Sequence, residues 1–73
     1  MSYYDLKELS IVYEAIVYLK DEYAVDIPFF RGSSIDDVKL QVNLEIETLL
    51  AELEQDPNTN QERIEELKDY LLE

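Results

Sequence analysis

The chain has 73 residues, with 18 Asp and Glu against six Lys and Arg, and it contains neither Cys nor His. This length predicts one domain over residues 1–73 with a small core, since so short a chain buries only about 60% of its unfolded surface. Without Cys or His there are no disulfides, no thiolate metal sites and no imidazole base. We therefore expect no enzyme activity, no cofactor and no metal.

The net charge of −12 sets the expected partners. It disfavours direct binding to nucleic acid and to anionic membranes, because both need Lys and Arg. It favours a protein partner with a basic surface. The chain has no run of 18 apolar residues, and Asp5 and Glu8 stand where a signal peptide is basic. Because the lack of Cys also suits a reducing compartment, we predict a cytoplasmic protein.

The first predicted element is a helix from Tyr3 to about Val25, because no residue in this range breaks a helix. Ser2 and Asp5 resemble a capping box at its start. Its apolar residues form two faces. The broader face, expected to be the core, holds Leu6, Leu9, Val12, Tyr13, Ile16, Val17, Leu19 and Tyr23, and is interrupted by Lys20. The narrower, opposite face holds Tyr4, Ile11, Ala15 and Tyr18.

A loop with two adjacent aromatic residues follows over residues 26–33. Pro28 keeps the residue before it out of helical conformation, and Gly32 permits a turn. Phe29 and Phe30 are expected either to plug the open end of a helical hairpin or to form an exposed aromatic anchor for a partner.

The second predicted helix begins after Ser34, with Asp37 as its capping-box partner, and ends near Gln55 before the turn signal Asp56-Pro57-Asn58. Its expected core face holds Ile35, Val38, Val42, Ile46, Leu49, Leu50 and Leu53. Residues 39–47 also alternate between polar and apolar, which is typical of a half-buried strand. We favour the helix because the helical spacing continues through Leu53.

The third predicted helix begins at Thr59, with Glu62 as capping partner, and runs to the C-terminus with Ile64, Leu67 and Leu71 on one face. The connector before it is short, so the second and third helices should form an antiparallel hairpin. The sequence thus predicts an all-α fold of three helices: a long first helix, an aromatic loop and a C-terminal helical hairpin.

The narrower face of the first helix is the leading candidate for a binding surface. Four of the six Tyr lie in the first 18 residues, and the second helix has a similar outer stripe with Leu40, Leu44 and Ala51. Either the first helix is central, with the other helices packed on both of its sides, or this face binds a partner or a second copy. We expect an adaptor or regulator that acts through Tyr4, Ile11, Ala15 and Tyr18, assisted by Phe29 and Phe30, and that forms a homo-oligomer.

An acidic stripe is the second candidate feature; it comprises Glu62, Glu65, Glu66, Asp69 and Glu73. These side chains repel one another, and the last of them oppose the helix dipole. The stripe is expected either to be a solvated face that keeps the protein in solution, or to imitate phosphates, or to attract a metal ion. One alternative function is therefore a nucleic-acid mimic of a phage or mobile element that blocks a basic cleft. A separate alternative, which does not depend on the stripe, is a small subunit of a larger assembly that needs its neighbours to fold.

Overall fold

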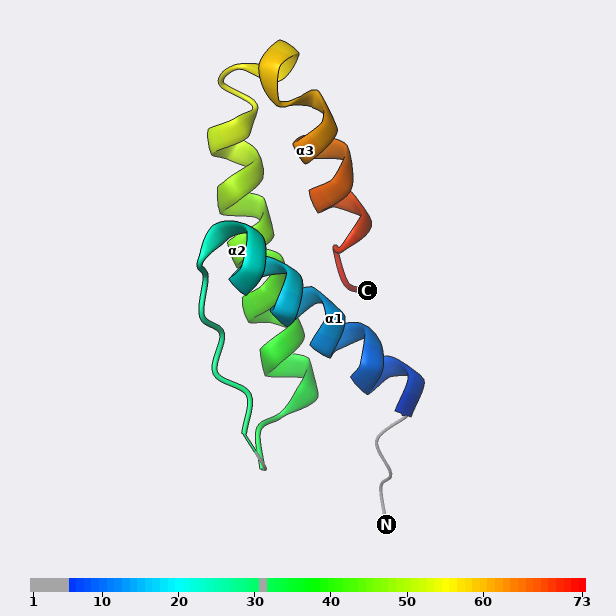
Figure 1. Cartoon of the computed structure of the whole chain (residues 1–73). Coiled ribbons are helices and arrows are strands. Elements are labelled where there is room, and N and C mark those ends of the chain that lie inside the picture. Colours follow the sequence, from blue (N-terminus) through cyan, green and yellow to red (C-terminus); the bar gives the residue numbers. More distant parts are fainter. Residues whose placement is uncertain (1–5, 31) are drawn as a thin grey trace.

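The computed structural model describes residues 6–30 and 32–73, which form three helices: α1 (Leu6–Tyr23), α2 (Ile35–Leu53) and α3 (Pro57–Asp69) (Figure 1). The predicted all-α fold is confirmed, and residues 39–47 are helical. Within the described ranges no residue is in a strand, and no helix is both long and apolar enough to cross a membrane. The predicted start of the first helix, including Ser2, Tyr3, Tyr4 and Asp5, lies outside the described residues.

The helix α1 ends at a residue in left-handed conformation. Ala24 has φ +55°, which an L-residue other than Gly adopts only at a cost. The backbone N–H of Ala24 still donates to the Lys20 carbonyl at 3.0 Å, and that of Val25 donates to the Leu19 carbonyl at 3.2 Å. These bonds satisfy carbonyls of the last turn, and the chain then turns into the loop that leads to α2.

The start of α2 agrees with its predicted cap, whereas the bounds of α3 differ from the prediction. The Ser34 side chain accepts a hydrogen bond from the backbone N–H of Asp37. The third helix begins at Pro57, not at Thr59, with Asp56 at the N-cap. The predicted start is wrong because proline, whose fixed φ suits helical conformation, is well tolerated at a first helical position where no N–H is needed. The helix α3 ends at Asp69, so the prediction that the third helix reaches the C-terminus is also wrong.

The helix α2 lies at the centre of the fold. Both α1 and α3 pack against it, and α3 runs antiparallel to it as predicted, while α1 crosses its N-terminal half (Figure 1). The interpretation that the first helix is central is therefore wrong. The core comprises Val12, Ala15, Leu19, Ile27, Val38, Val42, Ile46, Leu50, Ile64 and Leu67.

The buried face of α1 differs from the predicted one. Its fully buried residues are Val12, Ala15 and Leu19, whereas Leu6 and Val17 of the expected core face are exposed. At 100° per residue, the buried face lies roughly 80° around the helix from the predicted one. The small Ala15 side chain therefore faces the core. The prediction that it lies on an outer face of the helix is wrong.

Candidate protein-binding surface

The exposed side of α1 carries three large apolar residues in a row. Leu6, Tyr13 and Val17 are 79%, 48% and 53% exposed, and their spacing of seven and four residues puts them on one side of the helix. We call these three residues the outer face. The helical spacing predicts all three to lie in the core. The signal against that assignment was Lys20, which lies on the same side, is exposed, and pairs with Asp26 at 3.5 Å.

The loop after α1 extends the apolar surface beside the outer face. The Phe29 ring stacks on the Tyr13 ring, with 4.9 Å between the ring centroids and 12° between the planes. Phe29 is half-buried and packs against the core, while the adjacent Phe30 is 69% exposed. The two predicted roles of these residues are thus divided: Phe29 packs on the core, and Phe30 projects into solvent.

The predicted binding residues do not lie together on one surface. Ile11 is exposed, but at the opposite edge of α1 from the outer face; Ala15 is in the core. Tyr18 is half-buried and stacks on Tyr70, with 4.0 Å between the ring centroids and 9° between the planes. Tyr4 lies outside the described residues.

Tyr18 belongs to an aromatic cluster that joins α1 to α3. It contacts Tyr23 edge-to-face at 6.1 Å, and the Arg63 guanidinium lies 5.7 Å from the Tyr23 ring centroid. Burial raises the pKa of the Tyr18 hydroxyl above its ordinary value, and the nearby Glu66 carboxylate raises that pKa further. This cluster explains why the Tyr18 ring is half-buried between aromatic neighbours and supports the packing of α1 beside α3.

A shallow hollow of about 370 Å³ adjoins the outer face at Val17. It is lined by Glu14, Val17, Tyr18, Asp21, Glu22 and Tyr70. All of its charged lining residues are carboxylates, and none of them forms an ion pair with another residue of the described ranges. The hollow therefore combines negative charge with aromatic rings, a surface that suits a cation.

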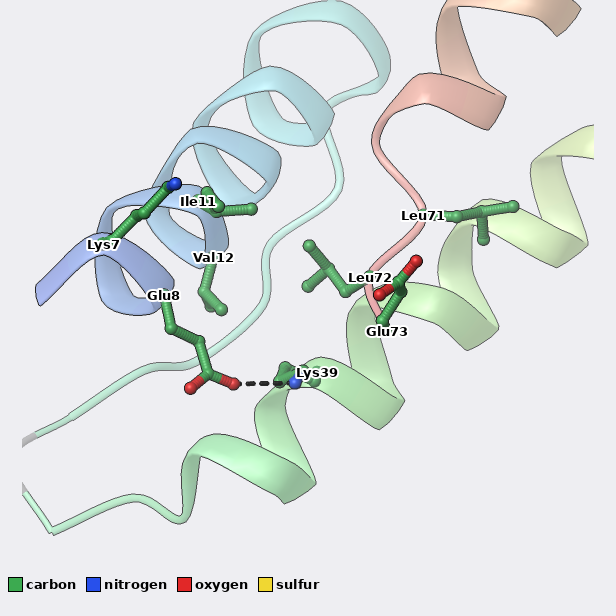
Figure 2. Close-up of a pocket in the computed structure, with 8 residues that line it drawn as sticks. All are labelled: Lys7, Glu8, Ile11, Val12, Lys39, Leu71, Leu72 and Glu73. Atoms are coloured by element: carbon green, nitrogen blue, oxygen red, sulfur yellow. Dashed lines mark hydrogen bonds and ion pairs between the residues drawn. The ribbon is translucent and has the colours of Figure 1, made fainter. Parts of the chain in front are cut away.

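A second hollow, of about 460 Å³, lies between α1, α2 and the C-terminal residues (Figure 2). It is lined by Lys7, Glu8, Ile11, Val12, Lys39, Leu71, Leu72 and Glu73. The Lys39 ammonium nitrogen and a Glu8 carboxylate oxygen are 2.7 Å apart, and this hydrogen bond raises the pKa of Lys39. Because this pair joins the two helices across the hollow, we assign it to the packing of α1 on α2.

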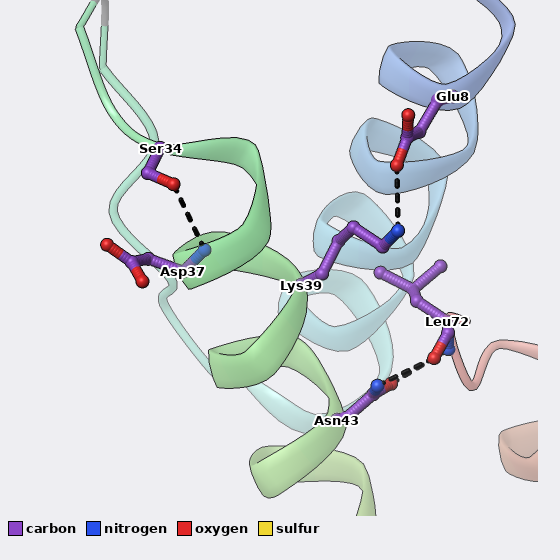
Figure 3. Close-up of polar contacts among 6 residues, drawn as sticks. All are labelled: Glu8, Ser34, Asp37, Lys39, Asn43 and Leu72. Carbon is purple, nitrogen blue, oxygen red and sulfur yellow. Dashed lines mark hydrogen bonds and ion pairs between the residues drawn. The ribbon is translucent and has the colours of Figure 1, made fainter.

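The residues after α3 are held by one side chain of α2. The Asn43 amide donates to the Leu72 carbonyl at 2.7 Å and accepts from the Leu72 backbone N–H at 2.8 Å (Figure 3). A single amide thereby satisfies both backbone groups of a residue outside regular structure. The Leu72 side chain packs against the core. Leu71, which was predicted to share one helix face with Ile64 and Leu67, is exposed.

The predicted acidic stripe is interrupted at the end of α3. Glu62, Glu65, Glu66 and Asp69 lie on the helix and are exposed, but Glu73 lies beyond it and lines the second hollow. Glu66 also interacts with Tyr18. In the part of the chain that the structure covers, no group of three or more acidic side chains is arranged to hold a metal ion.

The exposed apolar stripe predicted on the second helix is present. Leu40 and Leu44 are large and exposed on α2, and Ala51 is exposed in line with them.

Comparison with known proteins adds no further information on function, since no family model, curated protein or solved structure matches the chain.

Proposed function

We propose that the protein is a non-enzymatic binding module, an adaptor or regulator, that docks on another protein through the outer face of α1 and Phe30. The observation that carries this proposal is the exposure of Leu6, Tyr13 and Val17 on one side of one helix. Large exposed apolar residues gathered on one side of a helix are typical of surfaces that bind other proteins. We place the proposed surface on the other side of the first helix from the narrower face, because Ala15 of the narrower face is buried.

The rigidity of this surface also supports the proposal. Tyr13 is held by its stack on Phe29, and Phe29 is held by the core. A surface whose aromatic side chains are already ordered loses less conformational entropy when a partner binds. Tyr and Phe also contribute large contact areas at the centres of binding sites.

The test introduces charge on the outer face without disturbing the core. A tagged chain with Leu6→Glu and Val17→Glu is compared with wild type as bait in native lysate at high salt, with quantitative mass spectrometry. The control carries Asn58→Glu and Gln61→Glu, which add the same charge at exposed helical positions of α3. Circular dichroism checks that all three chains are equally helical.

The proposal predicts a protein that wild type and control retain and that the outer-face variant loses. If all three chains retain the same proteins in the same amounts, the outer face is not the binding surface. Tyr18, a natural target from sequence alone, is unsuitable for this test because it supports the aromatic cluster between α1 and α3.

A second candidate function is mimicry of nucleic acid. It is favoured by the exposure of Glu62, Glu65 and Asp69 along α3, where none forms an ion pair with any other residue in the described ranges. It predicts a partner that is retained only at low salt and is displaced by added duplex DNA or RNA. Neutralising these three acids to Gln or Asn should then abolish retention, and unchanged retention would refute mimicry.

A further inference from the structure

The charges around the outer face are unevenly distributed. On one edge, Glu14 and Asp21 are exposed and form no ion pair with any residue in the described ranges. Lys20, which lies on the same side of the helix as the outer face, is already paired with Asp26. A partner that covers the apolar residues would therefore bring its own groups against uncompensated carboxylates at this edge.

This edge and the hollow beside it form one continuous surface with the apolar residues. Val17 belongs to the outer face and also lines the hollow of Glu14, Asp21 and Tyr18. A partner side chain that follows an apolar contact at Val17 thus meets carboxylates and aromatic rings next.

A second copy of this chain fits the edge poorly. Each copy carries a net charge of −12, and an antiparallel pairing of two α1 helices would place the Glu14 and Asp21 edge against itself. Like charges directly opposite each other oppose association. A partner with positive charge at this position removes that repulsion and is attracted by the whole chain.

Resting on the proposed function, we propose that the partner is a basic amphipathic segment: its apolar side chains cover Leu6, Tyr13 and Val17, and a Lys or Arg beside them enters the hollow at Glu14 and Asp21. Within the molecule itself, Arg63 lies over the Tyr23 ring of the adjoining aromatic cluster. The partner's cation lies beside the Tyr18 and Tyr70 rings that line the hollow, which add to the attraction of the carboxylates.

The probe for this proposal is a displayed library of random 16-residue peptides, selected on the immobilised full chain. Selected peptides are synthesised, and their affinity is measured by fluorescence anisotropy at low and high salt. We expect them to combine apolar residues with Lys or Arg and to bind more weakly as salt increases. They should also lose binding to the variant with Leu6→Glu and Val17→Glu.

The decisive variant neutralises the lining of the hollow with Glu14→Gln, Asp21→Asn and Glu22→Gln. We expect it to bind the selected peptides about three- to tenfold more weakly, because each partly exposed ion pair contributes little by itself. The matched control removes the same number of charges from exposed positions of α2 and its C-cap. It carries Glu47→Gln, Glu52→Gln and Glu54→Gln. The control should bind within about twofold of wild type.

The outcomes separate this inference from the proposed function. The proposal of a basic partner would be overturned if the selected peptides lack Lys and Arg, or if the hollow variant and its control weaken binding equally. In either case the outer face would remain the binding surface as long as the variant with Leu6→Glu and Val17→Glu still abolishes binding. If no selected peptide depends on the outer face, the proposed function itself fails. A dimer in sedimentation velocity that the outer-face variant dissociates would identify a second copy as the occupant, and would also overturn the basic partner.

Discussion

Replacing Asn43 by alanine removes both hydrogen bonds that hold Leu72 against α2. Each such bond contributes about 1 kcal/mol to the free energy of unfolding, so the loss amounts to about 2 kcal/mol. Alanine is the better residue inside a helix, and it returns about 0.6 kcal/mol. The net expectation is a destabilisation of about 1.4 kcal/mol, or about 6–11 °C in Tm for a domain of this size.

Urea unfolding followed by circular dichroism measures this change, and a truncation after Tyr70 isolates its cause. In the truncated chain the Asn43 side chain has lost its partner at Leu72, so Asn43→Ala should cost nothing there and should show only the gain in helix propensity. Hydrogen exchange at the Leu72 amide should accelerate in the full-length variant, because its acceptor is gone. An equal effect of Asn43→Ala in the full-length and truncated chains would refute the assignment of this side chain to the C-terminal residues.

Four further changes test other parts of the structure. Leu19→Ala should destabilise the fold by about 3 kcal/mol or more, much of the roughly 4–11 kcal/mol available to such a chain, whereas Leu6→Ala should change the urea midpoint by little because Leu6 is exposed. Ala24→Gly should raise the free energy of unfolding by about 1 kcal/mol, since glycine adopts the left-handed conformation without strain; a fall would contradict that helix end. Because folding raises the pKa of Tyr18, the contribution of this side chain to the free energy of unfolding is fully present below its ordinary pKa of 10.0 and is lost as the pH rises above that value. Tyr18→Phe should therefore reduce the fall in urea midpoint between about pH 9 and pH 11, and an unchanged fall would contradict the raised pKa. Added NaCl should raise Tm because it screens the repulsion within a chain of net charge −12; a Tm independent of salt would show that this repulsion is negligible.

The positions of the helices follow from local sequence. Ser34 accepts the Asp37 backbone N–H at the start of α2, and the spacing of Val38, Val42 and Ile46 puts their side chains on one buried face. These features act over three or four residues and are therefore visible in the sequence. They also decided correctly between helix and strand for residues 39–47. The start of α3 was misplaced by two residues because Pro57 both ends one segment and suits the first position of the next.

The location of the candidate surface depended on packing between helices. Apolar residues cover so much of the circumference of α1 that the sequence permits more than one core face, and the broader stripe was predicted to be the core. The structure buries the side with the small Ala15, next to Val12 and Leu19. The aromatic stacks of Tyr18 on Tyr70 and of Tyr13 on Phe29 then fill the two flanks. Neither stack joins two residues of the same helix, so helical periodicity in the sequence cannot predict these stacks.

The sequence by itself thus determined an acidic, all-α chain of three amphipathic helices, because charge, caps and periodicity are properties of short segments. Only the tertiary structure decided that α2 is central and that Leu6, Tyr13 and Val17 face solvent while Ala15 is buried. The physical reason is that a helix with apolar residues on several sides can bury only one of them, and the choice depends on which side chains of α2, α3 and the aromatic loop fit against it.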